Sequence, residues 1–127
     1  MLSAIQQSTI EISSSIFLDN YSTTGGAITA ADYASFSVTN CTFSRNLMYR
    51  SIHSSDIYMK ESRAYALVKD NVFRDNTSPA LVDVLSGSLI FQGNLITDIR
   101  AELPETNDIF VLLLYNCYSL EAKNNRF

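Results

Sequence analysis

Four charged residues lie within one short stretch of the sequence and could form an acid–base cluster: Asp56, Lys60, Glu61 and Arg63. Carboxylates can bind a divalent cation, and a lysine or arginine beside them can abstract a proton. A solvated loop is the simpler interpretation, because charged side chains are mostly exposed. His53 is the only histidine of the chain, so a histidine-based triad has no second candidate, and we interpret it as a surface residue. We predict no catalytic residue.

Four further charges recur at one position of a repeat described below: Asp19, Arg45, Asp75 and Asp98. If equivalent residues stack, Arg45 lies between Asp19 and Asp75 and is attracted to both. Exposed ion pairs add little to stability, so this arrangement would mainly set the register of the stack. Asp75 and Asp98 could attract a cation, but a metal site needs further oxygen ligands. We therefore predict no metal site and no cofactor.

The composition limits the classes of protein to consider. The chain has 127 residues, enough for one hydrophobic core, and we treat residues 1–127 as a single domain. Apolar residues make up 46% and charged residues 17%, which indicates a globular chain. The net charge of -4 and the scattered basic residues argue against a nucleic-acid partner. No stretch reaches the ~20 apolar residues of a membrane span, and the first residues lack the pattern of a signal peptide.

A phenylalanine followed three residues later by asparagine recurs along the chain. The clearest copies begin at Phe17, Phe43 and Phe73, and weaker copies place Ile96 and Phe127 at the same position. An apolar residue precedes each of these anchors by five positions, with small or polar residues between them. The anchors recur at intervals of roughly 20–30 residues, a range in which repeats form solenoids and related arrays.

Within each copy, apolar residues alternate with polar ones, as they do in a β-strand. Helix signals are scarce, whereas β-branched and aromatic residues are plentiful. Short strands broken by asparagine predict a parallel β-solenoid with three short strands per coil. The third strands are predicted at Gly25–Ile28, Asp56–Met59, Ala80–Val84 and Asp108–Leu114. Because the strict six-residue period of a left-handed solenoid is missing, we predict an all-β, right-handed parallel β-helix of about five coils.

Stacked coils give the asparagines a structural role. Equivalent residues of neighbouring coils lie ~4.8 Å apart, so one side-chain amide can donate to the next and form a ladder. Asparagine also tolerates the left-handed backbone of a sharp bend. We predict such a ladder at Asn71, Asn94 and Asn125, with Ser15 and Cys41 in the same column. The adjacent apolar stack is predicted to contain Phe17, Phe43, Phe73, Ile96 and Phe127.

The coil pattern from about Ile10 to Phe127 resembles the right-handed parallel β-helix repeat of the pectate-lyase-like superfamily. The segments "FLDN…GGAI", "FSRN" and "FRDN" are similar to the FxxN and GGA[ILV] repeats of bacterial polymorphic outer-membrane proteins, and similar repeats occur in large surface proteins of protists. This resemblance implies an extracellular or cell-surface location. Such a fold hosts many functions, and we expect a structural or adhesive segment without catalysis.

Two other functions stay open. Many members of the superfamily cleave acidic polysaccharides, but the NTD, DD, GHG and RIK signatures of its polygalacturonase-like enzymes do not occur in the sequence. A carbohydrate-binding or polysaccharide-cleaving module would use the face of the third strands, where Tyr58, Lys60 and Asp83 are the candidate ligand contacts. The chain could also be a scaffold subunit of a large complex, with no ligand of its own.

The ends and bends of a solenoid lead to three further expectations. A solenoid exposes unpaired backbone at each end, so we expect the partners to be further β-helix coils or another protein chain at the open ends, with carbohydrate as a further candidate. Insertions are predicted to be exposed and irregular at Leu47–Ser55 and Arg100–Asn107. Sequons begin at Asn20, Asn40 and Asn76. Because these three asparagines occupy bends, we expect their side chains to face the ladders and to carry no glycan.

Overall fold

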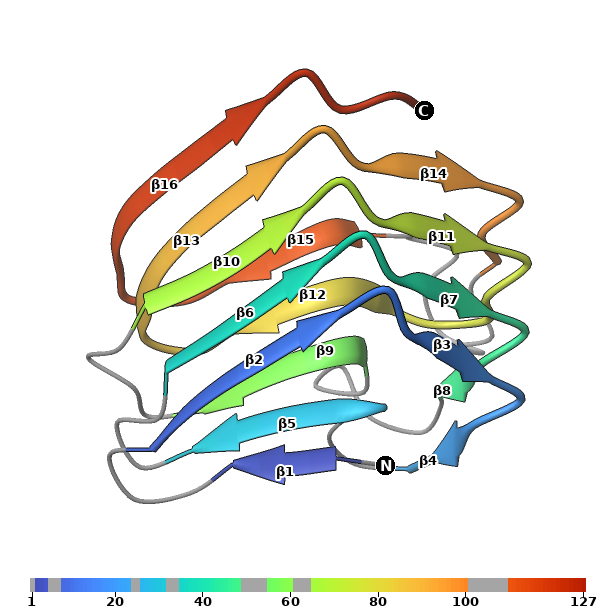
Figure 1. The fold of residues 1–127 in the computed structure, drawn as a ribbon, viewed down its shortest axis with the longest axis horizontal. Helices are drawn as coiled ribbons and strands as arrows, with labels where there is room; N and C mark the ends of the chain where they lie inside the picture. The colour runs from blue at the N-terminus through green and yellow to red at the C-terminus, as the bar shows by residue number, and fades with distance from the viewer. Residues whose placement is uncertain are drawn as a thin grey trace.

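The structure, a computed structural model, describes residues 2–4, 8–23, 26–31, 35–48, 55–60, 65–100 and 110–127. All regular structure in these ranges consists of β-strands, and the strands pair in parallel. Strands that are distant in the sequence stack one above the other as consecutive coils (Figure 1). The prediction of an all-β parallel solenoid is confirmed.

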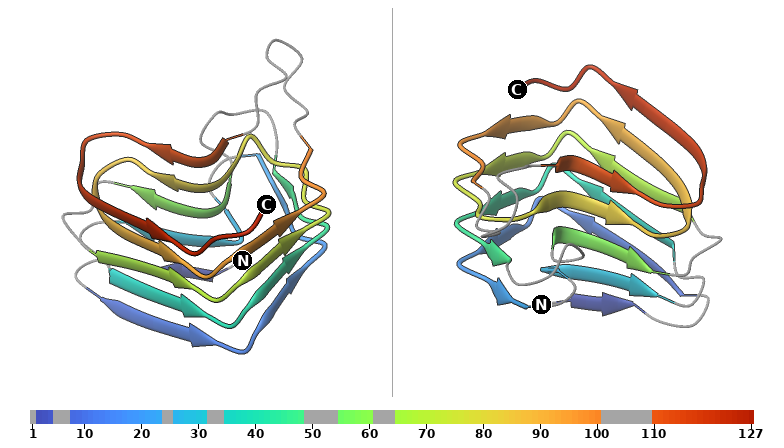
Figure 2. Two further views of the ribbon diagram at one scale, coloured as in Figure 1. Left: turned by 90° about the horizontal axis from the view of Figure 1, so that it is seen from above. Right: turned by 180° about the vertical axis from the view of Figure 1, so that it is seen from behind.

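The strands form four parallel sheets. Sheet A contains, in spatial order, β1 (Leu2–Ala4), β5 (Ile28–Ala31), β9 (Ser55–Lys60), β12 (Ala80–Val84) and β15 (Phe110–Leu114). Sheet B contains β2 (Thr9–Ser13), β6 (Ser35–Thr39), β10 (Tyr65–Lys69), β13 (Gly87–Gln92) and β16 (Cys117–Lys123). Sheet C contains β3 (Ile16–Leu18), β7 (Thr42–Ser44), β11 (Val72–Arg74) and β14 (Leu95–Thr97), and sheet D contains β4 (Tyr21–Ser22) and β8 (Leu47–Met48). Sheets B and C meet at a bend, and sheet A closes the coil opposite them (Figure 2).

Sheet D gives the coil a short fourth side, which the prediction of three strands per coil lacks. Strands β4 and β8 pair in parallel. Isolated bridges from Leu47 to Thr77 and from Thr77 to Arg100 continue the same pairing into the following coils. The sequence does not predict this sheet, because two residues are too few to show an alternating pattern.

The prediction that Leu47–Ser55 is exposed and irregular is wrong at both ends of the segment. Leu47 and Met48 form β8, and the Met48 side chain is buried in the core. Ser55 is the first residue of β9 and is also buried. The middle of the segment, and residues 101–107 of the second predicted insertion, lie outside the described residues.

The bends are made by residues with a left-handed backbone, and these residues precede the ladder asparagines. Between sheets B and C they are Ser14, Asn40, Asp70, Gly93 and Asn124, with φ between 49° and 67°. After sheet C they are Asp19, Arg45, Asp75 and Asp98, with φ between 52° and 54°. The residues that turn the chain therefore directly precede the ladder residues Asn71, Asn94 and Asn125. Aspartate, asparagine and glycine tolerate this backbone best, which explains why they dominate the positions just before the ladder.

The interior contains the predicted aromatic stack. Phe17, Phe43 and Phe73 occupy the same register position on β3, β7 and β11. The ring centroids of Phe17 and Phe43 are 4.8 Å apart, and those of Phe43 and Phe73 are 4.9 Å apart, with the rings within 10° of parallel. This spacing is the distance between neighbouring strands, so the stack follows directly from the register. Ile96 takes the next position and is buried.

Phe127 does not join the enclosed part of the stack. The residue before it, Arg126, bridges Leu95, so Phe127 follows in the register of Ile96. Its side chain is nevertheless 82% exposed. The prediction of an interior position for Phe127 is therefore wrong for this structure, because no described residue covers the ring from the other side.

Gly26 has no room for a side chain, and replacing it by alanine is expected to destabilise the fold. A Cβ atom at this position would lie 2.5 Å from the Ser55 carbonyl oxygen and 2.8 Å from that of Asp56. Both atoms belong to the backbone of the next strand in sheet A, so the clash can be relieved only by separating the coils. We expect Gly26→Ala to lower the free energy of unfolding by about 1–3 kcal/mol, measured by urea denaturation.

Gly93→Ala is the matched control for this substitution. Gly93 has a left-handed backbone with φ of 67°, and a Cβ atom there would meet the carboxylate of Asp70. The Asp70 side chain is exposed and can rotate away, so the remaining cost is the backbone strain of a left-handed alanine, about 1–2 kcal/mol. A Gly93→Ala protein that is less stable than the Gly26→Ala protein would contradict the assignment of close backbone packing to Gly26.

Candidate functional site

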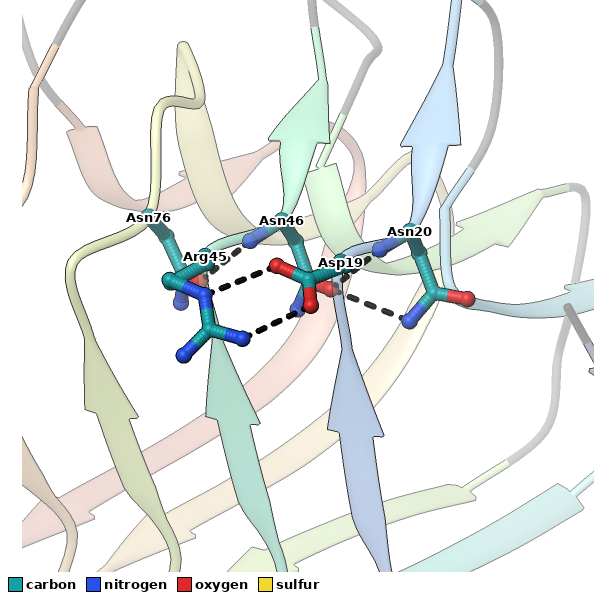
Figure 3. A network of polar contacts seen from close by, with 5 residues as sticks. All are labelled: Asp19, Asn20, Arg45, Asn46 and Asn76. Carbon is teal, nitrogen blue, oxygen red and sulfur yellow. Dashed lines mark hydrogen bonds and ion pairs between the residues drawn. The ribbon is translucent and has the colours of Figure 1, made fainter.

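The polar groups with the most developed geometry lie at the bend after sheet C. Arg45 donates from Nε to Asp19 Oδ1 at 2.8 Å and from Nη2 to Asp19 Oδ2 at 2.7 Å (Figure 3). The hydrogen bonds from Arg45 hold the pKa of the Asp19 carboxyl below its usual value. The same bonds raise the pKa of Arg45, and the negative charge of Asp75 contributes less. The predicted charge column is therefore present as one bidentate pair, with Asp75 acting on Arg45 through its field.

Beside this ion pair runs an asparagine ladder formed by the last residue of each FxxN motif (Figure 3). Asn20 donates from its backbone nitrogen and from Nδ2 to Asn46 Oδ1, both at 3.0 Å. The Asn46 backbone nitrogen donates to Asn76 Oδ1 at 3.0 Å, and Asn76 Nδ2 donates to the Phe43 carbonyl at 3.1 Å. Asn46 and Asn76 are buried. The expectation that the Asn20 and Asn76 side chains face a ladder is confirmed, whereas sequence reasoning assigned no ladder position to Asn46.

The predicted ladder between sheets B and C is also present. Asn71 donates to Asn94 Oδ1 from its backbone nitrogen at 3.0 Å and from Nδ2 at 3.1 Å. Asn94 donates in the same way to Asn125 Oδ1, at 3.0 Å for each donor. Each Nδ2 also reaches back to a carbonyl of the preceding coil, as Asn71 does to Val38 at 2.9 Å. Buried amides are thus satisfied by neighbouring coils, which is the condition for placing them in a core.

Cys41 and Ser15 occupy the same column but contribute differently. The Cys41 backbone nitrogen donates to Asn71 Oδ1 at 2.8 Å, so the ladder extends one coil further through the backbone. The Cys41 thiol is free and buried, and its sulfur lies 3.3 Å from the Thr39 carbonyl. The Ser15 hydroxyl donates to the Ser13 carbonyl at 2.9 Å. The side-chain ladder itself therefore begins at Asn71.

Asp56 is a fully buried carboxyl that lies beside the ladder of Asn20, Asn46 and Asn76. Its Oδ1 atom accepts a hydrogen bond from Asn46 Nδ2 at 2.8 Å. Its Oδ2 atom has no hydrogen-bond partner among the described residues. Burial raises the pKa of Asp56 to about 7, and the bond from Asn46 opposes this increase. A carboxyl that is partly protonated at neutral pH is an acid–base group by chemistry, but burial separates it from solvent.

The raised pKa of Asp56 is expected to make stability depend on pH. Between about pH 4 and pH 7 the unfolded chain ionises this carboxyl while the folded chain keeps its proton. The contribution of the protonated Asp56 carboxyl to the free energy of unfolding is therefore fully present below the unfolded pKa of 3.8 and is lost as the pH rises toward 7. At about 1.4 kcal/mol per pH unit, the folded state loses roughly 4 kcal/mol across this window.

Asp56→Asn should abolish this part of the pH dependence, because the amide oxygen can still accept from Asn46 and carries no titratable proton. Urea denaturation at several pH values from 4 to 8 measures the effect. Asp19→Asn is the control, since the pKa of Asp19 is lowered rather than raised. An Asp56→Asn protein with the same fall in stability between pH 4 and pH 7 as the original chain would show that another group causes it.

A pocket of about 570 Å³ opens beside the ladder of Asn20, Asn46 and Asn76, and both positive and negative side chains line it. It is lined by Arg45, Asn46, Leu47, Asp75, Thr77 and Arg100. Arg45 is already engaged by Asp19, and Asn46 by the ladder. The pocket is therefore a polar surface hollow next to the bend.

The predicted ligand face is only partly accessible. Asp83 on β12 pairs in register with Tyr58 on β9, so the structure brings these two residues side by side. Lys60 is exposed and Tyr58 is half-buried, whereas Asp83 is fully buried. The prediction of an open ligand face that includes Asp83 is therefore wrong for this structure. The remaining members of the charged cluster, Glu61 and Arg63, lie outside the described residues, as does His53.

Three other predictions concern positions that the structure describes. Among the described residues, no group of three or more His, Cys, Asp or Glu side chains is placed to hold a metal ion. The described part of the chain has no helix that is long and apolar enough to cross a membrane.

The side chain of Asn40 is exposed, so the expectation that all three sequon asparagines face the ladders is wrong for Asn40. The reason is its left-handed backbone, which turns it away from the ladder column.

Comparison with known proteins identifies a family. The sequence model of the family described as "Right handed beta helix region" matches residues 2–127. No curated protein and no solved structure matches the chain. The match covers almost the whole chain and agrees with the four stacked parallel sheets.

Proposed function

The chain belongs to the right-handed β-helix family, and from this premise we propose that it is a non-catalytic structural or adhesive segment of a surface or extracellular protein or assembly. The use of its polar groups supports this proposal. The buried amides of Asn46, Asn71 and Asn94 are held within ladders, and the Arg45 guanidinium is held by Asp19. These groups stabilise the stacking of coils, which is the property that a structural segment needs.

The surface of the last described coil supports a partner that stacks on it. Strands β15 and β16 are the outermost strands of sheets A and B, and each pairs on one side. Leu120 is in register with the buried Leu89, yet Leu120 is 47% exposed. Phe127 is exposed in the register of the aromatic stack. Exposed core positions beside unpaired strand edges are suited to parallel addition of another coil.

The ladder also gives this end a chemical preference. At each earlier rung the backbone nitrogen and Nδ2 donate to the Oδ1 atom of the next coil, as at Asn94. Asn125 stands at the corresponding position of the last described coil and would donate in the same direction. The partner that fits is a β-helix coil with an asparagine or another side-chain acceptor at the ladder position, from the same protein or from another chain.

The experiment is to measure the mass of residues 1–127 in solution by light scattering over a range of concentrations. We expect association, and we expect Leu120→Glu with Phe127→Glu to abolish it by placing charge on the stacking surface. Tyr65→Glu is the control, because Tyr65 is an exposed residue of β10, a strand that is paired on both sides within sheet B. A concentration-independent monomer, or association that survives the double substitution but not Tyr65→Glu, would contradict the stacking proposal.

A carbohydrate-binding function is the second candidate, and the exposure of Lys60 beside Tyr58 on β9 favours it. A phenol and an ammonium group on one strand face suit an acidic sugar, through stacking and ion pairing. Calorimetric titration with oligogalacturonate tests this candidate, and Lys60→Ala should weaken any binding. Binding that is unchanged by this substitution would place the sugar elsewhere. A scaffold role within a large complex would use the same end surfaces as the structural proposal.

A further inference from the structure

The three sequons differ sharply in the environment of the asparagine that would carry a glycan. They are Asn20-Tyr21-Ser22, Asn40-Cys41-Thr42 and Asn76-Thr77-Ser78. An N-linked glycan is bulky and requires an asparagine Nδ2 atom that reaches solvent. The position of each Nδ2 atom in the fold therefore decides which sequon the folded chain can use.

Two of the sequons are less accessible to a glycan in this fold than the third. Asn76 is fully buried, and its Nδ2 atom donates to the Phe43 carbonyl. Asn20 is part-buried, and its Nδ2 atom donates to Asn46 Oδ1 within the ladder that these two residues form with Asn76. The core has no space for a sugar at Asn76, and a sugar at the part-buried Asn20 would crowd the ladder residue Asn46.

Asn40 has the opposite environment. It lies at the bend between sheets B and C with φ of 53°, and its side chain is exposed. Its Nδ2 atom donates a hydrogen bond to Ser14 Oγ at 3.2 Å in an exposed position. The residues at the same bend on the neighbouring coils, Ser14 and Asp70, are also exposed. A secondary amide keeps one N–H group, so a glycosylated Asn40 could still donate to Ser14.

We propose that Asn40 is an N-glycan acceptor site. The reaction joins Asn40 Nδ2 to the anomeric carbon of a lipid-linked oligosaccharide. The anomeric carbon–oxygen bond to the lipid diphosphate breaks, the diphosphate leaves, and the amide loses one proton. The site rests on the proposed surface or extracellular role, because the donor is met on the secretory route.

The place of Asn40 in the fold gives the glycan a consequence for assembly. The bend between sheets B and C forms a ridge along the side of the stack (Figures 1 and 2). A glycan at Asn40 would cover this side wall while leaving the surfaces of β15 and β16 free. It would therefore allow stacking along the solenoid axis and oppose lateral packing of one solenoid against another.

The test is to express residues 1–127 behind a cleavable secretion leader in animal cells and to measure the mass of the secreted protein before and after peptide N-glycosidase treatment. We expect a shift of one glycan. The shift should be lost in Asn40→Gln and in Thr42→Val, which removes the sequon hydroxyl but keeps a β-branched residue on β7. It should persist in Thr42→Ser, which keeps the sequon.

The outcomes separate this site from the proposed function. Because the leader supplies secretion, a secreted protein without a glycan would overturn the Asn40 site and leave the structural proposal standing. A mass shift that survives Thr42→Val would also overturn it, since the glycan would then be attached elsewhere. Glycopeptide mapping that finds the sugar on Asn76 of a folded protein would contradict the burial argument itself.

Discussion

Replacing Phe43 by alanine is expected to lower the free energy of unfolding by about 3–5 kcal/mol. Phe43 is fully buried, and its ring is stacked between Phe17 on one side and Phe73 on the other. Alanine would leave a cavity the size of a phenyl ring in the middle of the column. The coils above and below are fixed by backbone pairing, so the cavity cannot collapse without breaking strand hydrogen bonds. Urea denaturation followed by circular dichroism measures the change.

Two members of the same column are graded controls for Phe43. Phe17 is half-buried and, among the described residues, stacks on the ring of Phe43 alone, so Phe17→Ala should destabilise the fold less. Phe127 is mostly exposed, so Phe127→Ala should have little effect on the unfolding of the monomer. If the three substitutions destabilise equally, or if Phe127→Ala costs the most, the enclosed stack is not what holds neighbouring coils together.

The register of the coils could be predicted from the sequence because one repeated spacing fixes it. The FxxN motif aligned Phe17, Phe43 and Phe73, and the structure pairs these residues across β3, β7 and β11. Side chains in a strand alternate between the two faces, so an error of one residue would have turned every phenylalanine outward. An apolar residue at a constant distance before each anchor removed that ambiguity.

The position of the left-handed residue could not be predicted in the same way. Asn40 and Asp70 precede the ladder column, and both residue types tolerate a left-handed backbone and also occur in hydrogen-bonded ladders or turns. Composition alone therefore does not say which of two consecutive polar residues turns and which one points inward. Arg45 shows the limit clearly, because arginine is not a residue expected at φ of 52°.

The candidate site was less predictable than the fold because burial is a property of the assembled coils. Asp56 and Asp83 looked like surface carboxylates on a strand, yet both are fully buried. The short sheet D places Asn46 within hydrogen-bond distance of Asp56, ten residues further along the chain. Since two-residue strands leave no alternating pattern, neither this contact nor the burial that raises the Asp56 pKa could be derived from spacing.

Replacing Asn71 by alanine is the second substitution with a large expected effect, because Asn71 connects three coils. Its Oδ1 atom accepts from the Cys41 backbone nitrogen at 2.8 Å, and its Nδ2 atom donates to the Val38 carbonyl and to Asn94 Oδ1. Alanine leaves a buried N–H group and a buried carbonyl without these partners. At about 1–3 kcal/mol for each of these two groups, the expected loss of stability is roughly 2–6 kcal/mol.

Hydrogen exchange distinguishes the ladder from a simple loss of packing. In Asn71→Ala the amide proton of Cys41 should exchange much faster relative to other core amides, because its acceptor is gone. Asn125→Ala is the matched control, since Asn125 is a less buried rung of the same ladder. It should destabilise less and leave the Cys41 amide protected relative to the rest of the core. If Cys41 exchanges equally fast in both proteins relative to global unfolding, the bond from Cys41 to Asn71 contributes no specific protection, and the ladder is a consequence of coil stacking rather than one of its causes.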